Sequence, residues 1–380
     1  MTRTIDSMTL QADFTSTATH RIRAAAATSG KLRIRGGGSK DFYGQALVGD
    51  VLDTRPLSGV VSYEPSELVV TALAGTPLAE LEALLLTQGQ CLPFEPPNHG
   101  GAATVGGMVA SGLSGPARAS AGAVRDFVLG VKLINGKGEP LTFGGQVMKN
   151  VAGYDVSRLM VGAMGTLGLL TEVSIKVLPV APLEATLKFE MTQTRALAQL
   201  HSWGGQPLPL NASCWLNEGS ADADSGTLYL RLRGAVAAVE AACAKLGGQR
   251  LPDAQASADW LLCRHQQLPW FLDRSDTQDL WRLSVPQTAP VLDLPEPPLM
   301  EWHGGLRWVR TNPQQGQRLR DAARAVGGHA TLFRASNAHD MSATGIFDIL
   351  KPPLDRIHRE LKREFDPQGV FNLHRMYADW

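Results

Sequence analysis

Two stretches of the sequence are dense in glycine in a way that suggests ligand binding by the backbone. The first is Arg35-Gly36-Gly37-Gly38-Ser39-Lys40, which directly follows the strand-like residues Leu-Arg-Ile. The second covers residues 100–179, where Gly, Ala, Ser and Thr alternate with short Val, Leu and Ile runs. Small side chains let a large group approach the backbone, and consecutive glycines can aim several N–H groups at one oxyanion. We interpret the two stretches together as a cradle for a large anionic ligand.

Neither stretch matches a named phosphate motif. Taken alone, the glycine triplet also suits an ordinary surface turn. A P-loop would need Ser or Thr after Lys40, which is followed by Asp41, and Asp41 also stands where G-x-G-x-x-G needs its third glycine. Gly162, Gly165 and Gly168 are spaced G-x-x-G-x-x-G and miss the same pattern. The prediction of an anion site therefore depends on the combination of the two stretches.

Side chains that could do acid–base or metal chemistry are scattered. The histidines have no H-x-H or H-x-x-H spacing, which predicts no metal site. Cys91, Cys214, Cys243 and Cys263 form no C-x-x-C pair, so they predict no iron–sulfur cluster in this chain. Candidate bases are His99, His303, His329, His339 and His374, and candidate carboxylate partners are Arg307, Arg310 and Arg334. Such residues are more often solvated or paired, so no catalytic base is assigned.

The composition is that of a globular protein with room for two domains. The chain has 380 residues, of which 44% are hydrophobic and 19% charged. Lys plus Arg equals Asp plus Glu at 36 each, so no overall charge favours nucleic acid, and any anion site is local. The first residues lack the apolar core of a signal peptide, and no apolar run reaches ~18 residues. We expect a cytosolic protein with reduced cysteines and no nucleic-acid partner.

Helices and strands alternate around the glycine stretches. The pattern predicts helices over 13–30, 77–88 and 104–111, and strands over 32–35, 46–51, 60–63, 68–73, 127–134, 140–143 and 169–178. Asn135-Gly136 predicts a hairpin turn between two of these strands. Residues 182–250 read as strand, helix, strand, strand and helix, an order typical of a ferredoxin-like unit. A last helix over 352–365 carries apolar residues on one face.

The combined pattern resembles a known flavoenzyme superfamily. The triplet RGGGSK, followed by GGAATVGGMVASGLSGP, VRDFVLGVKLINGKGE and GAMGTLGLLTEVSIKVLP, is similar to the FAD-binding domain of the PCMH type, which includes vanillyl-alcohol oxidase and p-cresol methylhydroxylase. Within it, nearly the whole chain resembles the FAD-binding E subunits of bacterial glycolate oxidases, including the tail FDPQGVFN.

The resemblance implies an α+β fold with three parts. Residues 1–180 would form a two-lobed FAD-binding domain, 181–335 a smaller ferredoxin-like cap, and 336–380 a C-terminal segment whose helix returns to the FAD domain. The residues implied to contact FAD are Arg35, Gly36, Gly37, Gly38, Ser39, Lys40, Thr104, Val105, Gly106, Gly107, Ser111, Val124, Arg125, Asp126, Gly165, Thr166, Gly168, Leu169, Leu170 and Asn372.

Two departures from the family pattern matter. Members that bind the flavin covalently carry His where this chain has Ser39, which predicts dissociable FAD, although Ser39 also suits a turn-capping hydroxyl. In the family an Asn followed by Pro-Gly comes near the flavin ring, whereas Asn372 is followed by Leu373 and His374.

The implied function is oxidation of glycolate, a small 2-hydroxyacid, to glyoxylate with an acceptor other than a nicotinamide. The implied partners are a second FAD subunit and an iron–sulfur subunit, and the implied location is the cytoplasm or, through the complex, the periphery of the inner membrane. Two alternatives stay open. The chain could hold FAD as a structural or electron-relay subunit, or it could be a stand-alone oxidase of another alcohol or 2-hydroxyacid.

Overall fold

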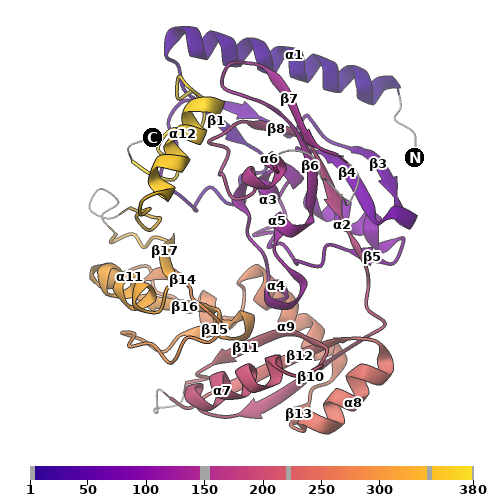
Figure 1. Cartoon of the computed structure of the whole chain (residues 1–380), viewed down its shortest axis with the longest axis vertical. Helices are drawn as coiled ribbons and strands as arrows, with labels where there is room; N and C mark the ends of the chain where they lie inside the picture. The colour runs from indigo at the N-terminus through magenta and orange to yellow at the C-terminus, as the bar shows by residue number, and fades with distance from the viewer. Residues whose placement is uncertain (1–4, 146–154, 220–223, 340–344, 379–380) are drawn as a thin grey trace. The chain divides into compact units, whose positions relative to one another are not determined.

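The computed structural model describes residues 5–145, 155–219, 224–339 and 345–378. They form two compact units (Figure 1). Unit 1 comprises Met1–Leu113, Ala123–Val180 and Ile349–Trp380, and unit 2 comprises Ser114–Gly122 and Ala181–Asp348. Both units mix helices with sheets, so the predicted α+β class is confirmed. No helix in the described ranges is long and apolar enough to cross a bilayer.

Unit 1 is built on an antiparallel sheet of five strands in the order β3-β4-β8-β6-β7. The strands are β3 Val60–Glu64, β4 Val69–Leu73, β6 Val128–Ile134, β7 Pro140–Gly144 and β8 Leu169–Lys176. Around them lie η1 Pro65–Glu67, α2 Leu78–Leu86, α3 Val105–Ser111, α5 Val124–Phe127, α6 Val156–Leu159 and the short pair β5 Gln90–Cys91 and β9 Leu178–Pro179. The helix predicted over 77–88 is α2, and its Leu78, Leu81 and Leu85 are fully buried.

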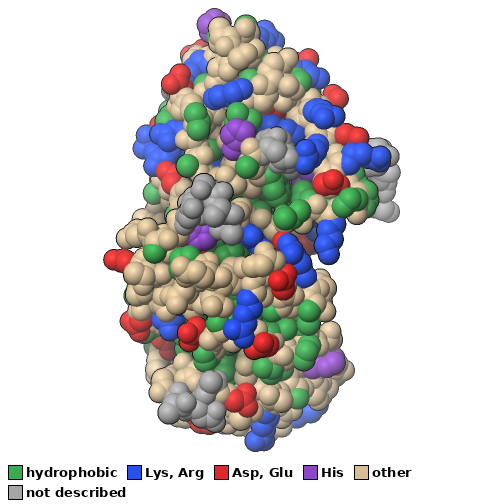
Figure 2. All heavy atoms as spheres, turned by 90° about the vertical axis from the view of Figure 1, so that its left-hand side faces the viewer, with side chains coloured by type: hydrophobic (Ala, Val, Ile, Leu, Met, Phe, Trp, Pro, Cys, Tyr) green, Lys and Arg blue, Asp and Glu red, His purple; other side chains and the backbone are tan. Residues whose placement is uncertain are grey.

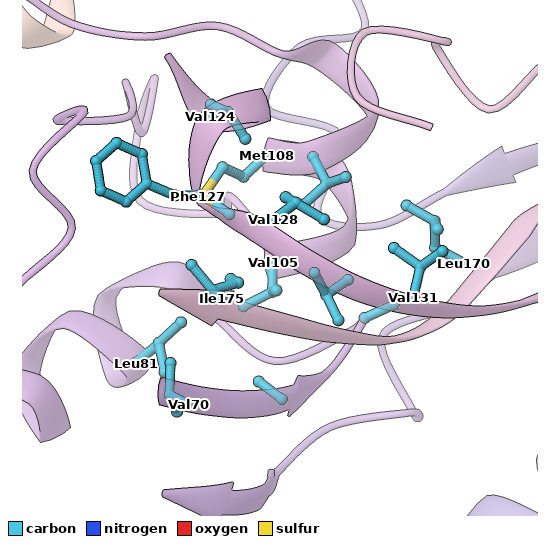
Figure 3. Close-up of a cluster of buried hydrophobic side chains, with 14 of the residues drawn as sticks. Val70, Leu81, Val105, Met108, Val124, Phe127, Val128, Val131, Leu170 and Ile175 are labelled. Carbon is cyan, nitrogen blue, oxygen red and sulfur yellow. The ribbon is translucent and has the colours of Figure 1, made fainter. Parts of the chain in front are cut away.

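The main core of unit 1 lies between this sheet and its helices. Figure 3 shows Val105 of α3 next to Ile175 of β8, and Met108 of α3 next to Val128 of β6. Phe94 packs on Phe127 with ring centroids 5.4 Å apart. The helix α3 is therefore anchored by its apolar side, which leaves its glycine-rich N-terminal turn available for another role.

A second core packs the N-terminal helix and strands against the C-terminal segment around Phe371. Helix α1 Ile5–Thr28 packs on β1 Leu32–Arg35 and β2 Asp50–Asp53, which pair in parallel. Phe371 is fully buried in the same cluster and forms a parallel bridge with Leu32. The helix before it is α12 Leu354–Phe365, which Figure 1 draws near β1.

Two local predictions need correction. The strand predicted over 46–51 begins only at Asp50, because pairing in register with Leu32–Arg35 places the strand at 50–53. The hairpin at Asn135-Gly136 exists, but Ile134 pairs with Pro140 and leaves a five-residue loop. The Oδ1 atom of Asn135 accepts the N–H groups of Lys137 and Glu139, both at 3.0 Å, so Asn135 organises the loop with its side chain.

Unit 2 contains one antiparallel sheet of eight strands in the order β13-β10-β12-β11-β15-β16-β14-β17. The strands are β10 Leu183–Glu190, β11 Leu210–Leu216, β12 Thr227–Gly234, β13 Gln249–Arg250, β14 Asp279–Ser284, β15 Leu299–Glu301, β16 Leu306–Thr311 and β17 His329–Arg334. The helices are α4 Arg118–Ala121, α7 Gln193–Gly204, α8 Val236–Leu246, α9 Asp253–His265, α10 Pro269–Leu272 and α11 Gly316–Ala325, with η2 Trp302–Gly304 and η3 Pro313–Gln315.

The sheet of unit 2 consists of two similar halves. β10 to β13 have the ferredoxin-like order that the sequence predicts for residues 182–250. β14 to β17 repeat this order as a mirror image, and β11 joins β15. The Pro-rich residues 286–298 replace the first helix of the second half.

The limits of the units differ from the predicted domain limits in two places. Residues 114–122 belong to unit 2, where the Nε1–H of Trp302 donates to the carbonyl of Gly115 at 2.9 Å. Residues up to Asp348 also belong to unit 2, because Ile346 is buried with Leu332. The sequence gives no sign of either boundary, since both depend on contacts between distant residues.

Figure 2 shows Lys and Arg interspersed with Asp and Glu over the face that it draws. This distribution agrees with the equal counts of the two charge types.

Candidate functional site

The glycine triplet after β1 packs so closely that side chains are excluded. A Cβ on Gly36 would lie 2.4 Å from Oγ1 of Thr104, and one on Gly37 would lie 1.4 Å from the carbonyl oxygen of Ala102. Gly38 has φ +73°, a conformation that L side chains rarely adopt. The loop can therefore lie against residues 102–104 only with glycine at these positions.

The N-terminus of α3 forms the opposite wall. Thr104 is its N-cap and accepts a hydrogen bond from the N–H of Gly107 at 3.2 Å. Gly106 donates to the carbonyl of Ala74 at 2.7 Å, and a Cβ there would come within 2.8 Å of the Ala74 methyl group. The start of this helix is thus held against β4 and the glycine loop, with small residues on its free side.

A third wall combines the loop before β8 with the C-terminal tail. Asn372 is buried, and its Oδ1 accepts the N–H of Ile34 at 2.8 Å while its Nδ2 donates to the carbonyl of Met164 at 2.7 Å. A Cβ on Gly165 would lie 2.6 Å from Nδ2 of Asn372. Asn372 therefore connects the strand that leads into the glycine loop with the loop at 162–168.

Two small cavities lie between these walls, with volumes of about 80 and 90 Å³. They share Gly36, Gly107, Met164 and Asn372 in their lining. Each has the volume of a few water molecules. They suit a phosphate-sized group, and the rest of a large ligand would have to extend beyond them.

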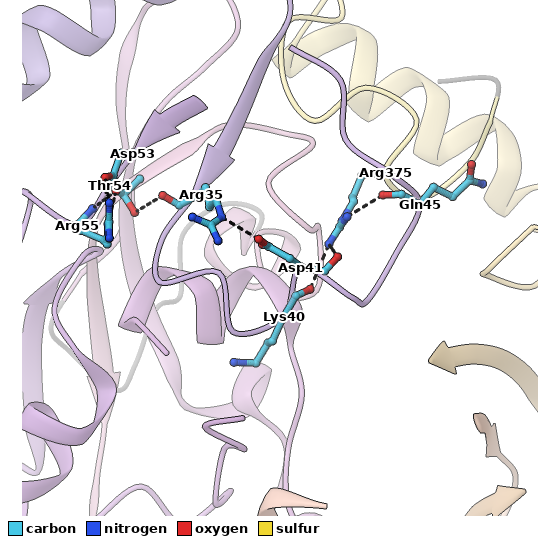
Figure 4. Close-up of polar contacts among 8 residues, drawn as sticks. All are labelled: Arg35, Lys40, Asp41, Gln45, Asp53, Thr54, Arg55 and Arg375. Atoms are coloured by element: carbon cyan, nitrogen blue, oxygen red, sulfur yellow. Dashed lines mark hydrogen bonds and ion pairs between the residues drawn. The ribbon is translucent and has the colours of Figure 1, made fainter. Parts of the chain in front are cut away.

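Charged groups surround the loop, as Figure 4 shows. Arg375, 5% exposed, donates to the backbone carbonyls of Gln45, Lys40 and Asp41 at 2.7, 3.1 and 3.2 Å. Arg35 pairs with Asp41 at 2.8 Å. The ammonium of Lys40 donates to Oγ of Ser39 at 3.3 Å, and burial lowers the pKa of Lys40 to about 8. A group that binds here meets two arginines and a lysine, together with the carboxylate of Asp41 that pairs with Arg35.

The structure brings most of the sequence-predicted residues to these two cavities. The predicted residues that line them are Arg35, Gly36, Gly37, Gly38, Ser39, Lys40, Thr104, Gly106, Gly107, Ser111, Gly165, Gly168, Leu170 and Asn372.

The remaining predicted residues lie elsewhere in unit 1. The side chains of Val105 and Val124 are fully buried in the core that Figure 3 draws, and Leu169 is buried with Phe371. Asp126 caps α5 by accepting the N–H of Ala123 at 2.8 Å. Arg125 and Thr166 line a different cavity of about 180 Å³. Alternation and helix spacing alone do not reveal which side of these short elements faces the core.

Several lining residues were missed by the sequence reasoning. They are Ile34, Asp41, Leu47, Thr54, Ala74, Ala110, Met160, Ala163, Met164, Leu167 and Arg375. Arg375 has the largest role among them, and no motif marks it, because its contacts cross from the tail to the glycine loop. In the sequence, Arg375 is distinguished only by its position three residues after Asn372.

Unit 2 contains a cavity with a volume of about 830 Å³. It is lined by aromatic residues such as Trp260 and Trp270, by Cys214 and Cys263, and by Arg310. The four cysteines of the chain are free thiols. Within the described ranges, no three His, Cys, Asp or Glu side chains are arranged to hold a metal ion.

Comparison with known families and structures places the site in context. The family model described as "FAD binding domain" matches residues 11–155. The solved structure of an alkyldihydroxyacetonephosphate synthase aligns with a TM-score of 0.62, at 16% identity, over 93% of this chain and 73% of that one. At this identity the likeness concerns the fold alone.

Curated relatives add the family. The chain is 44% identical to glycolate oxidase subunit GlcE of Escherichia coli (strain K12), over 98% of this chain and 100% of the relative. It is 30% identical to glycolate oxidase subunit GlcD of Bacillus subtilis (strain 168), over 37% of this chain and 29% of that protein. D-lactate dehydrogenase of Anaerostipes hadrus is 32% identical over 34% of this chain and 27% of its own. The chain, which has an FAD-binding domain, therefore belongs to the family of the glycolate oxidase subunit GlcE.

Proposed function

We propose that this chain is an FAD-binding subunit of an oxidoreductase complex that oxidises glycolate to glyoxylate and passes the electrons to an acceptor other than a nicotinamide. The observation that carries the proposal is the 44% identity to a glycolate oxidase subunit over 98% of this chain and 100% of that subunit. The matches to dehydrogenases of D-lactate and D-2-hydroxyglutarate support the same class of substrate.

The residues of the cradle fit the pyrophosphate of FAD. Two negative charges need converging N–H donors and nearby cations. The glycine loop has no room for a Cβ, so no side chain covers its backbone there. Lys40, Arg35 and Arg375 supply positive charge. We propose that the cavity-lining residues from 35 to 40, with Thr104, Gly107, Ser111 and Asn372, hold this end of the cofactor. Ser39 cannot form the covalent bond of a histidine, so we propose dissociable FAD.

The chain's own residues then have binding and positioning roles. Bound FAD would supply the acceptor for the two electrons that leave the C–H bond of the 2-hydroxyacid. The buried Asn372 would fix the loop at 162–168 against Ile34, and Arg375 would fix the glycine loop from its outer side. Oxidation of the alcohol also needs a group that accepts the hydroxyl proton.

We propose two partners, in keeping with the name of the relatives as subunits. One is a second FAD subunit, and the other is an iron–sulfur subunit that takes the electrons onward. The complex would work in the cytoplasm or at the periphery of the inner membrane.

Mixing experiments test the need for partners. The isolated chain, loaded with FAD, is expected to show negligible glycolate-dependent dye reduction under anaerobic conditions. Addition of the second flavin subunit and the iron–sulfur subunit is expected to restore it. Rapid bleaching of the flavin by glycolate in the isolated chain would contradict the need for partners and make this chain a competent dehydrogenase. Substitutions in this chain that abolish its FAD binding can then be tested in the complete complex. If glycolate-dependent dye reduction survives them, the FAD of this chain is not needed and its role is structural.

FAD affinity is expected to fall as the pH rises through about 8, because Lys40 has a pKa of about 8 and loses its charge above it. Bound phosphate stabilises the charged form of Lys40, so above pH 8 the binding of FAD requires the uptake of one proton. The affinity for FAD therefore falls by at most about tenfold per pH unit. FAD titrations of the empty chain at several pH values check this. Lys40→Met should bind FAD more weakly below pH 8 and lose this part of the pH dependence. An unchanged pH profile in Lys40→Met would contradict the role of the lysine.

A further inference from the structure

The turn between β15 and β16 in unit 2 presents a tryptophan in an unusual backbone conformation. Trp302 and His303 have φ +54° and +55°, in the left-handed region that side chains rarely adopt. Such backbone persists only where its surroundings hold it. Here the Nε1–H of Trp302 donates to the carbonyl of Gly115 at 2.9 Å, and the carbonyl of Trp302 accepts from Nε2 of Gln287 at 3.2 Å. The indole ring is therefore fixed in place and 6% exposed.

Two arginines from different parts of unit 2 converge on this ring. The guanidinium carbon of Arg118 lies 4.4 Å from the ring centroid, and that of Arg282 lies 5.1 Å from it. Arg118 comes from the 114–122 segment and Arg282 from the middle of β14. Stacking on an indole holds a guanidinium by its face and leaves its N–H edge able to donate within its plane.

The surroundings of Arg282 carry mainly positive charge. No ion pair involving Arg282 occurs within the part of the chain that the structure describes. Burial, and then the charges of Arg282 and Arg118, lower the pKa of His329, the residue that pairs with Ser284 at the end of β14. The charge of Asp348 raises the pKa of His329, but Asp348 is itself ion-paired with Arg324.

His303 adds polarity without charge. Its Nδ1 lies 3.1 Å from Oγ of Ser213, and its Nε2 lies 3.0 Å from Oγ of the exposed Ser120. Burial lowers the pKa of His303 to about 4, so the ring is neutral near pH 7. The positive charge beside Trp302 therefore comes from the two arginines.

We propose that Arg118 and Arg282, held by Trp302, bind the carboxylate of a small 2-hydroxycarboxylate. A guanidinium donates two parallel N–H bonds to one carboxylate, and two such groups give strong and selective binding. That this carboxylate is glycolate rests on the proposed function. In sequence, the 114–122 segment lies between α3 and α5.

The arginines that sequence reasoning favoured suit this role less well. Arg307 is fully buried and donates to the backbone carbonyls of Gly304, Pro290 and Ala289. Arg310 also stacks on an indole, that of Trp270 at 4.5 Å, but the charges of Asp273 and Glu296 act on it. Arg310 is therefore a matched control, since it is an arginine on a tryptophan in the same unit with acidic groups nearby.

Binding of glycolate to the full-length, FAD-loaded chain, measured by calorimetry, tests the proposal. Arg118→Gln and Arg282→Gln should each weaken glycolate binding at least about tenfold, because each removes charge-assisted hydrogen bonds. Arg282→Lys, which keeps the charge without the planar fork, should lie between wild type and Arg282→Gln. Arg310→Gln should bind glycolate as wild type does, and glycolamide, which lacks the carboxylate charge, should bind to none of them.

Circular dichroism of every variant distinguishes a folding defect from the loss of a contact with glycolate. The FAD content distinguishes a failure of this inference from a failure of the proposed function. Wild type that retains no FAD would contradict the proposed function. If wild type retains FAD, the inference is overturned by any of three results: undetectable glycolate binding, equal binding of glycolate and glycolamide, or unchanged affinity in both glutamine variants.

Discussion

Replacing Asp366 by Ala is expected to destabilise unit 1 by about 3–5 kcal/mol, because it leaves a buried ammonium without its counter-charge. Lys362 is 5% exposed and its Nζ lies 2.6 Å from Oδ2 of Asp366, which is 1% exposed. The two carboxylate oxygens of Asp366 also accept the N–H groups of Val370 and Phe371, at 2.8 and 2.9 Å. One carboxylate thus fixes both the last turn of α12 and the start of the tail.

The effect should extend to the cofactor. The ammonium of Lys362 also donates to the carbonyl of Thr166 at 2.7 Å, so the same pair connects the tail with the loop that precedes β8. Denaturant unfolding of the FAD-free chain, followed by fluorescence, measures the stability. FAD titration of the folded variant should show weaker binding, since Asn372 follows this segment directly.

Glu364→Ala is the matched control for Asp366→Ala. It removes an acidic residue two positions earlier, in α12, but the carboxylate of Glu364 is 78% exposed and lies 3.4 Å from Lys137. Exposed pairs of this kind contribute about 0–1 kcal/mol, so its stability should stay close to that of wild type. Equal stability of Asp366→Ala and Glu364→Ala would show that the buried pair does not hold the tail.

Gly37→Ala is expected to abolish FAD retention. The added Cβ would stand 1.4 Å from the carbonyl oxygen of Ala102, so the glycine loop would have to move away from the start of α3. The glycine loop and the start of α3, which are two walls of the proposed pyrophosphate site, would then separate. The measurement is the flavin content of the purified variant, together with circular dichroism to confirm that the chain is folded.

Gly204→Ala serves as the control for Gly37→Ala. No atom lies within 4 Å of a Cβ added at Gly204, the last residue of α7. This variant should retain FAD as wild type does. A yellow Gly37→Ala protein with wild-type flavin content would mean that the glycine loop is not the pyrophosphate site.

Local patterns predicted the elements around the site well. Helix α2 forms where the residues predict it, because its leucine face is buried. The strand predicted over 169–178 forms mainly as β8, which is buried on both faces along nearly its whole length. The glycine loop was also recognisable, since only small residues permit the contacts seen at Gly36 and Gly37.

What the sequence could not predict depends on contacts between distant residues. Arg375 reaches the glycine loop across more than 300 residues of sequence, and residues 114–122 join unit 2 through Trp302. Val105 and Val124 lie within the right segments, but their side chains face the core. The arginine pair on Trp302 was missed for the same reason, because Arg118 and Arg282 are 164 positions apart and neither belongs to a motif.

The absorption spectrum of the purified wild-type chain, before and after acid precipitation, tests the central claim most directly. The account predicts a flavin spectrum with FAD equimolar to protein, and a yellow supernatant over a colourless pellet after acid treatment. A purified, folded chain without flavin absorbance, even after incubation with FAD, would contradict the claim that the cradle binds FAD. Flavin that stays on the precipitated protein would contradict the claim that the cofactor is dissociable.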